Sequence, residues 1–189
     1  CYHLYTKHQD RANRRLHPIA ASIGRASPPA GAIVLFEGNK THSFVSMLGE
    51  TSDWPIVGGA LVSTPNSRRS NNLVSRLHFR DALIHVEFEL PKTGDGNNGV
   101  YRHGLYEIQI LRSPTPPSRS KSDMGAVYGL HPPRTAAGLG PGKWQSLEIC
   151  FRAPQTDSAG TLQSSGTITA WLNGRLIQDR AKIAEKASD

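Results

Sequence analysis

The stretch NNGVYRHGLYEIQIL, residues 97–111, holds two short segments that are joined at His103 and Gly104. In the second segment Glu107 and Gln109 alternate with two isoleucines. Successive side chains of a strand point to opposite faces, so this spacing predicts a half-buried strand that carries a carboxylate and an amide on its polar face. Such a pair suits the binding of a polar ligand better than a plain solvated face would.

The rest of the chain repeats this pattern of short apolar or alternating runs. Eighteen glycines and thirteen prolines separate them. Frequent turn residues between short runs are typical of all-β proteins, and Asn173-Gly174 between two apolar segments is a strong hairpin signal. We therefore predict ten or eleven short strands in a two-sheet jelly-roll sandwich. Their ranges are 32–38, 44–48, 55–63, 72–79, 82–90, 98–104, 105–111, 126–130, 146–154, 166–179 and 181–183.

A chain of 189 residues is long enough for one domain with tails. We predict an extended basic arm at residues 1–31, a jelly-roll domain at 32–183 and a short tail at 184–189. The arm holds five Lys or Arg residues against one Asp and ends in a run with two prolines. Its composition cannot bury enough apolar surface to fold alone, so the arm is expected to be held by its own domain or by a protein partner.

The formal net charge of +7 raises the question of an anionic partner. No helix-turn-helix pattern or basic platform with interleaved aromatic residues accompanies the charge, which argues against nucleic acid. An anionic membrane surface or an acidic protein partner fits the arm better.

Cys1 and Cys150 are the two cysteines, and they imply no disulfide framework. Bacterial lipoproteins begin with a cysteine that carries acyl chains, so we expect a lipid anchor at Cys1, with an arbitrary chain boundary as the alternative. An anchored protein of this kind would lie on the periplasmic or extracellular side of a bacterial cell envelope. Cys150 falls within a predicted strand and is expected to be a buried thiol.

A second alternating run, ALIHVEFEL at residues 82–90, places His85, Glu87 and Glu89 on one face. If this strand neighbours the strands of residues 97–111, His85 and Glu87 converge with Arg102, Glu107 and Gln109. Such a face suits sugar hydroxyls and a polarised carbonyl. A solvated sheet face is the simpler alternative.

Metal ligation is a further option because histidines and carboxylates on neighbouring strands can meet without a sequence motif. The candidates within the domain are His78, His85, His103 and His131. The sequence fixes no cofactor and leaves a divalent metal open. Nucleophile-elbow, phosphate-loop and dinucleotide motifs are absent from it.

The order of motifs resembles the bacterial 3-keto-disaccharide hydrolases, a family with a concanavalin-like jelly roll. The similar segments span about residues 32–183 and include VLFEG, WPIVGGALVS, NLVSRLHFRDALIHVEFELP, GNNGVYRHGLYEIQIL, MGAVYGLHPP, PGKWQSLEICFRAP and TITAWLNGRLIQD. The resemblance implies cleavage of glycosides oxidised at C3, in which the ketone acidifies the C2 proton and a base drives elimination of the glycosidic oxygen.

Residue by residue, the resemblance implies a catalytic set of Glu107, Glu87 and Arg102. It also implies sugar binding by Gln109, Tyr128 and Trp144, and the position of His103 beside Arg102 adds a further candidate. The chain departs from the family's usual residues at Asn98, Arg112 and Gln145. Two alternatives therefore stay open beside a glycoside hydrolase or lyase: a non-catalytic accessory subunit of a membrane-associated complex, held through its arm, and a carbohydrate-binding module.

Overall fold

The computed structural model describes residues 3–7, 27–38, 43–63, 72–113 and 117–183, and every regular element among them is a strand. No helix in these ranges has the length and apolar character needed to cross a bilayer. The strands in chain order are β1 (His3–Lys7), β2 (Ile33–Phe36), β3 (Phe44–Val45), β4 (Ile56–Val57), β5 (Ala60–Leu61), β6 (Val74–Ser75), β7 (Ala82–Glu89), β8 (Asn98–Arg102), β9 (Tyr106–Ile110), β10 (Trp144–Arg152), β11 (Gln155–Thr156), β12 (Leu162–Ser164), β13 (Gly166–Leu172) and β14 (Arg175–Ile183).

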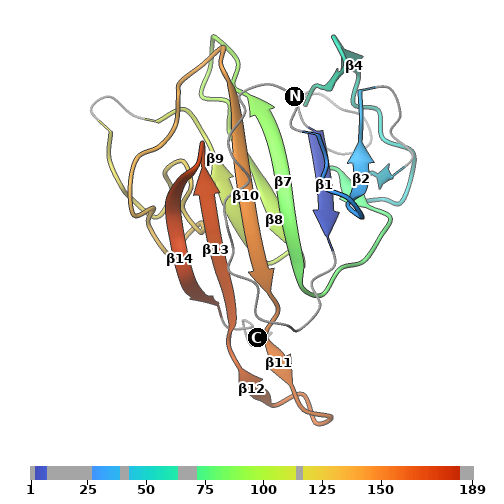
Figure 1. Cartoon of the computed structure of the whole chain (residues 1–189), viewed down its shortest axis with the longest axis vertical. Helices are drawn as coiled ribbons and strands as arrows, with labels where there is room; N and C mark the ends of the chain where they lie inside the picture. Colours follow the sequence, from blue (N-terminus) through green and yellow to red (C-terminus); the bar gives the residue numbers. More distant parts are fainter. Residues whose placement is uncertain (1–2, 8–26, 39–42, 64–71, 114–116, 184–189) are drawn as a thin grey trace.

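The largest layer is a six-stranded antiparallel sheet in the order β14-β13-β10-β7-β1-β2. Its two central long strands, β7 and β10, are paired from Ala82 opposite Phe151 to Glu89 opposite Trp144. Figure 1 shows the β8–β9 pair behind β7 and β10, as part of the opposite layer of the sandwich. The β11–β12 hairpin extends from one end of the molecule.

The core lies between these two layers. The main sheet contributes Val86 and Phe88 of β7 and Leu147 of β10 to the core. The opposite layer contributes Ile108 and Ile110 of β9. The alternating patterns of β7 and β9 thus direct their apolar side chains toward one another. Their polar side chains must therefore point away from the core on opposite sides of the sandwich.

The turn chemistry that the sequence predicts is confirmed at both hairpins. Asn173 and Gly174, with φ of 52° and 76°, join β13 to β14, and His103 and Gly104, with φ of 52° and 69°, begin the turn from β8 to β9. Left-handed conformations at consecutive turn residues match the twist of a hairpin, which is why Asn-Gly occurs there.

Several predicted strands differ in detail. Ranges 44–48 and 72–79 each hold a strand of two residues, β3 and β6, and 166–179 is divided between β13 and β14. Residues 55–63 form the short β4–β5 hairpin around Gly58 and Gly59 instead of one strand. In the range 126–130, Val127 alone makes ladder bridges, to Ile108 and His131. Residues 181–183 belong to β14 and are separated from its first half by a bulge.

Part of the predicted arm lies within the main sheet. β1 pairs with β7 on one side and with β2 on the other, so its backbone groups are satisfied by the domain itself. The rest of the arm up to Ala26, Cys1 included, and the predicted tail at 184–189 lie outside the described residues.

Candidate active site

The outer face of the β8–β9 hairpin carries the polar pair that the sequence singles out. Tyr101 lies opposite Glu107 in the ladder, and Gly99 lies opposite Gln109. Val100 and Ile108, which alternate with them, face the core. The two strands thus place Tyr101 and the carboxylate of Glu107 side by side on one face.

Tyr101 donates a hydrogen bond of 2.7 Å from its hydroxyl to Glu107 Oε2. Partial burial, and then this bond and the charge of Glu107, raise the pKa of Tyr101 to about 12. The phenol therefore stays protonated at neutral pH and remains a hydrogen-bond donor. Gly99 makes room for this arrangement, because a Cβ at that position would overlap the carboxylate of Glu107.

Gln109 adds a donor on the other side of the same carboxylate. In one orientation of its amide, Nε2 donates to Asn97 Oδ1 at 3.3 Å. In the other, the nitrogen donates to Asn98 O at 2.9 Å and to Glu107 Oε1 at 3.2 Å. We favour the second because it satisfies two acceptors, and it gives each oxygen of Glu107 its own donor.

The segment Gly125–Tyr128 extends this face beyond β9. Gln109 N donates to Ala126 O at 3.0 Å, and Tyr128 N donates to Glu107 O at 2.9 Å. Tyr101 and Tyr128 are 51% and 52% exposed, so both phenol rings are accessible beside the carboxylate. We call the set formed by Tyr101, Glu107, Gln109 and Tyr128 the Glu107 site.

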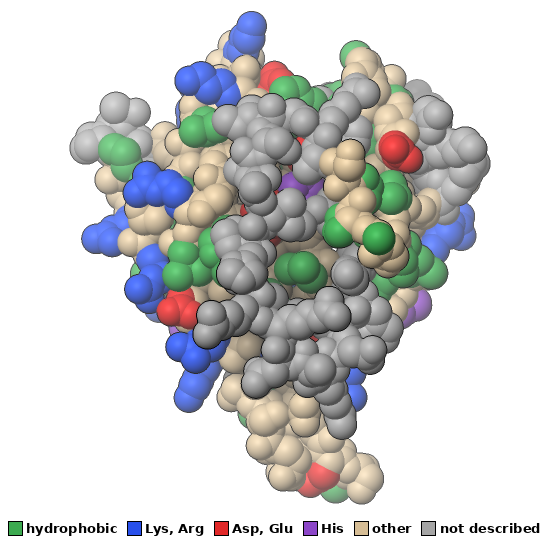
Figure 2. Space-filling model, viewed as in Figure 1, with side chains coloured by type: hydrophobic (Ala, Val, Ile, Leu, Met, Phe, Trp, Pro, Cys, Tyr) green, Lys and Arg blue, Asp and Glu red, His purple; other side chains and the backbone are tan. Residues whose placement is uncertain are grey.

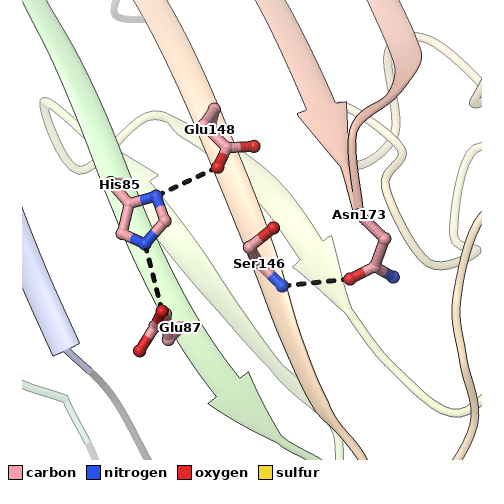
Figure 3. Close-up of polar contacts among 5 residues, drawn as sticks. All are labelled: His85, Glu87, Ser146, Glu148 and Asn173. Atoms are coloured by element: carbon pink, nitrogen blue, oxygen red, sulfur yellow. Dashed lines mark hydrogen bonds and ion pairs between the residues drawn. The ribbon is translucent and has the colours of Figure 1, made fainter. Parts of the chain in front are cut away.

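A second polar cluster lies on the outer face of the main sheet (Figure 3). His85 Nδ1 is 3.0 Å from Glu148 Oε1, and His85 Nε2 is 3.7 Å from Glu87 Oε1. An ionised carboxylate only accepts, so a hydrogen bond from His85 to ionised Glu148 requires the proton on Nδ1. His85, Glu87 and Glu148 are between 2% and 6% exposed. Beside them Ser146 N donates to Asn173 Oδ1, in the turn between β13 and β14, at 3.0 Å. This cluster is buried throughout, whereas the Glu107 site combines the buried Gln109 with the half-exposed rings of Tyr101 and Tyr128.

Comparison with known proteins adds to this geometry. The family model of the 3-keto-alpha-glucoside-1,2-lyase-like domain matches residues 31–189. The chain belongs to this family. The resemblance inferred from the sequence is thereby confirmed. A search among curated proteins finds no match.

Two crystal structures of candidate glycosyl hydrolases from Parabacteroides distasonis ATCC 8503 resemble this family member. The first is 24% identical, with a TM-score of 0.75 over 89% of this chain and 79% of the other. The second is 15% identical, with a TM-score of 0.58 over 82% of this chain and 72% of the other. These likenesses concern the fold and confirm the predicted all-β jelly-roll sandwich.

The expectation that the polar residues of this 3-keto-alpha-glucoside-1,2-lyase-like domain converge on one face is wrong. β7 belongs to the main sheet and β9 to the opposite layer, and the core fills the space between them. Glu87 and His85 therefore lie on the far side of the sandwich from Glu107 and Gln109. The alternation of residues correctly predicted which side chains of each strand point toward the core. It could not predict which sheet each strand joins, because that depends on pairing between distant parts of the chain.

Arg102 and His103 lie at the turn end of the hairpin, against the core. The Arg102 guanidinium stacks 4.9 Å over the Phe151 ring and donates to Phe79 O at 3.3 Å, and burial lowers its pKa. His103 meets the same two residues, with its ring edge-on to Phe151 at 5.0 Å and Nε2 3.2 Å from Phe79 O. These contacts hold the hairpin against Phe151 of the main sheet, so Arg102 and His103 have a structural role here.

Trp144 and Arg112 also lie apart from the Glu107 site. Trp144 is paired with Glu89 at the end of β10, with the same alternation as Ser146 and Glu148, so it shares their outer face of the main sheet. Arg112 donates to Lys92 O at 2.8 Å and to Pro91 O at 3.4 Å. Its guanidinium is thus held by carbonyl oxygens of the loop after β7.

The described residues contain no group of three or more His, Cys, Asp or Glu side chains arranged to hold a metal ion. His131 contacts Lys182 O at 2.7 Å, and Gln145 accepts from Leu139 N at 2.8 Å and from Asn173 Nδ2 at 3.2 Å. Asn98 uses its side chain to accept from Gly99 N at 2.8 Å. A divalent metal stays an expectation from the sequence.

Two residues that matter here were not singled out from the sequence. Tyr101 follows Val100 in the run NNGVYR, and counting back from the turn at His103 and Gly104 would have placed it opposite Glu107. Glu148 stands in the alternating run SLEIC, but nothing in the sequence pairs that strand with His85.

Proposed function

We propose that the Glu107 site cleaves glycosides whose sugar ring is oxidised at C3. The observation that carries the proposal is the carboxylate of Glu107, held between the Tyr101 hydroxyl and the Gln109 amide on an accessible face. A base for this reaction must be oriented and must be reachable by the substrate. Membership of the 3-keto-alpha-glucoside-1,2-lyase-like family supports this class of substrate.

In the proposed reaction, Glu107 takes the proton from C2 of the sugar. The electron pair of that bond moves onto the C3 ketone as an enolate and then forms a double bond between C1 and C2, and the bond between C1 and the glycosidic oxygen breaks. The leaving oxygen departs with that bond's electron pair and takes up the proton that Glu107 removed. Water then adds across the double bond, with its hydroxyl at C1 and its proton at C2. A donor beside the base is needed because negative charge develops on the ketone oxygen when C2 loses its proton.

Tyr101 is the donor that the site offers for that charge. Its hydroxyl proton bonds Glu107 Oε2 before the reaction, and it can turn to the enolate oxygen once Glu107 has taken up the C2 proton. The exposed rings of Tyr101 and Tyr128 provide apolar surfaces against which the face of a pyranose ring packs. Glu87, Trp144, Arg102 and His103 have no direct part in this proposal.

The test is to incubate the purified protein with a 3-keto-glucoside, with and without added divalent metal, and to follow loss of the ketosugar. Glu107→Gln keeps the shape of the side chain and removes the base, so turnover should fall by at least about a hundredfold. Glu37→Gln changes an exposed glutamate at the end of β2 and serves as the matched control. Absence of turnover in the unaltered protein would instead favour the accessory subunit or the carbohydrate-binding module.

Anchoring in a bacterial envelope through a lipid on Cys1 is a separate proposal, because that residue lies outside the described ones. The cysteine and the basic arm in the sequence support it. Mass spectrometry of the N-terminal peptide from the native host tests it, and an unmodified Cys1 thiol would refute it. A protein partner on residues 1–31 would be detected by crosslinking of the same material.

A further inference from the structure

A group of Lys and Arg side chains lies over β14 and the segment 117–135 that packs against it. Figure 2 shows Lys and Arg side chains gathered along the left side of the molecule, the side on which Figure 1 shows β14. The carboxylate of Asp179 lies in this region, with Oδ2 3.9 Å from Arg134 Nη1 and Oδ1 3.5 Å from Arg180 Nε. We call the region the β14 basic surface, and its exposed cationic residues are Arg119, Lys121, Arg134, Arg175, Arg180 and Lys182.

Direct contacts join the two parts of this surface. Arg119 Nη1 donates to Arg134 O at 2.7 Å, and Arg134 N donates to Ile177 O on β14 at 2.8 Å. Arg175 Nη2 donates to Thr135 Oγ1 at 3.1 Å. The charges are therefore neighbours in one folded surface, although they are far apart in the sequence.

The backbone of β14 is distorted in the middle of this surface. Ala170 pairs with Gln178 and Ile168 with Ala181, so Asp179 and Arg180 together oppose the single residue between Ile168 and Ala170. Arg180 adopts a φ of 46°, a strained conformation for a residue with a side chain, and its side chain is 81% exposed. The bulge directs a guanidinium outward at an energetic cost to the fold, which is common at functional surfaces.

The β14 basic surface borders the Glu107 site. Gly129 N donates to Lys121 O at 2.9 Å, and the adjacent Tyr128 N donates to Glu107 O at the same distance. His131 contacts Lys182 O at 2.7 Å, so this loop reaches from β9 across to the end of β14. A long ligand on the basic surface could thus continue to the carboxylate of Glu107.

We infer that the β14 basic surface binds an acidic polysaccharide and leads it to the Glu107 site, an inference that rests on the proposed function for its sugar chemistry. The cationic groups are spread out, with Arg175 and Lys182 about 20 Å apart along the strand. A spread of this kind fits a polymer that repeats its charges better than one small anion. Four of the six groups are arginines, whose planar guanidinium pairs with the carboxylate or sulfate groups of such a glycan.

The experiment measures binding of the full chain to immobilised polygalacturonate at about 20 and about 150 mM salt, with dextran as the neutral polymer. All proteins carry Glu107→Gln, so that turnover does not enter the result. Arg134→Glu with Arg180→Glu reverses two charges of the surface. Arg76→Glu with Arg80→Glu reverses two exposed charges elsewhere in the chain and changes the net charge equally.

The surface variant should lose about tenfold in affinity at the lower salt, and the control pair should stay within about twofold of the parent. Binding of dextran should be weak for all proteins. Equal losses in the two variants would overturn the inference, as would tighter binding of duplex DNA or of phosphatidylserine vesicles than of polygalacturonate at the same salt. Missing turnover in the unaltered enzyme would count against the proposed function alone.

Discussion

The Tyr101 hydroxyl and Glu107 Oε2 are joined by a 2.7 Å hydrogen bond across the β8–β9 hairpin. The bond links a half-exposed phenol to the carboxylate that Gln109 contacts from the other side. Both residues stand on the solvent face of a hairpin whose other face is in the core. The strand pair thus holds a carboxylate beside a hydroxyl donor, which is the arrangement that the proposed proton abstraction next to a ketone requires.

The first prediction concerns stability at high pH. The pKa of Tyr101 is raised from 10.0 in the unfolded chain to about 12 in the fold, so the folded state binds this proton more tightly. The stabilisation is fully present below pH 10 and is lost as the pH rises from 10 to 12. Urea unfolding midpoints should therefore fall more steeply over that window in the unaltered protein than in Tyr101→Phe. Equal slopes for the two proteins would contradict a raised pKa of Tyr101 in the folded state.

The second prediction concerns Gly99, over which the Glu107 carboxylate lies. Gly99→Ala adds a methyl group where that carboxylate stands and should destabilise the fold by about 1–3 kcal/mol. In a Glu107→Ala background the obstruction is gone, so the same substitution should cost less than about 1 kcal/mol. A double-mutant cycle by chemical denaturation measures the difference. Additive effects of the two substitutions would contradict the close approach of Gly99 and Glu107.

Sequence alternation predicted the two faces of β7 and β9, and Asn173-Gly174 predicted the hairpin between β13 and β14. These features depend on neighbours in the chain, where strand geometry and turn chemistry decide. The placement of β1 between β7 and β2, and of Glu148 beside His85, depends on which distant strands pair. No local pattern encodes that choice, so the predicted meeting of Glu87 with Glu107 failed although both were placed on the correct face of their own strand.

The third prediction concerns the closed cluster on the main sheet. His85→Leu would leave the carboxylates of Glu148 and Glu87 buried without the imidazole between them and should lower the free energy of unfolding by about 3 kcal/mol. Adding Glu148→Met removes one of these charges and should restore part of the loss. Urea denaturation measures both variants. A loss below about 1 kcal/mol for His85→Leu would mean that the cluster is not needed for stability.

The fourth prediction concerns Arg180, which adopts a φ of 46° in the bulge of β14. Arg180→Gly relieves this strain and should raise the free energy of unfolding by about 1 kcal/mol, while it weakens binding to acidic polysaccharide. Lys182→Gly, in the regular part of the same strand, should instead lower the free energy of unfolding by about 0.5–1 kcal/mol. Thermal unfolding of both variants tests the contrast, which fails if Arg180→Gly is the less stable of the two.

The most direct test of the central claim is the fate of the C2 proton when a 3-keto-glucoside is cleaved in deuterium oxide. Nuclear magnetic resonance of the released ketosugar, corrected for exchange in a sample without enzyme, should show deuterium at C2 with the unaltered protein and with Glu37→Gln. Glu107→Gln should give neither cleavage nor exchange above that background. Cleavage that retains the original C2 proton, or cleavage by Glu107→Gln at the unaltered rate, would contradict the assignment of Glu107 as the base.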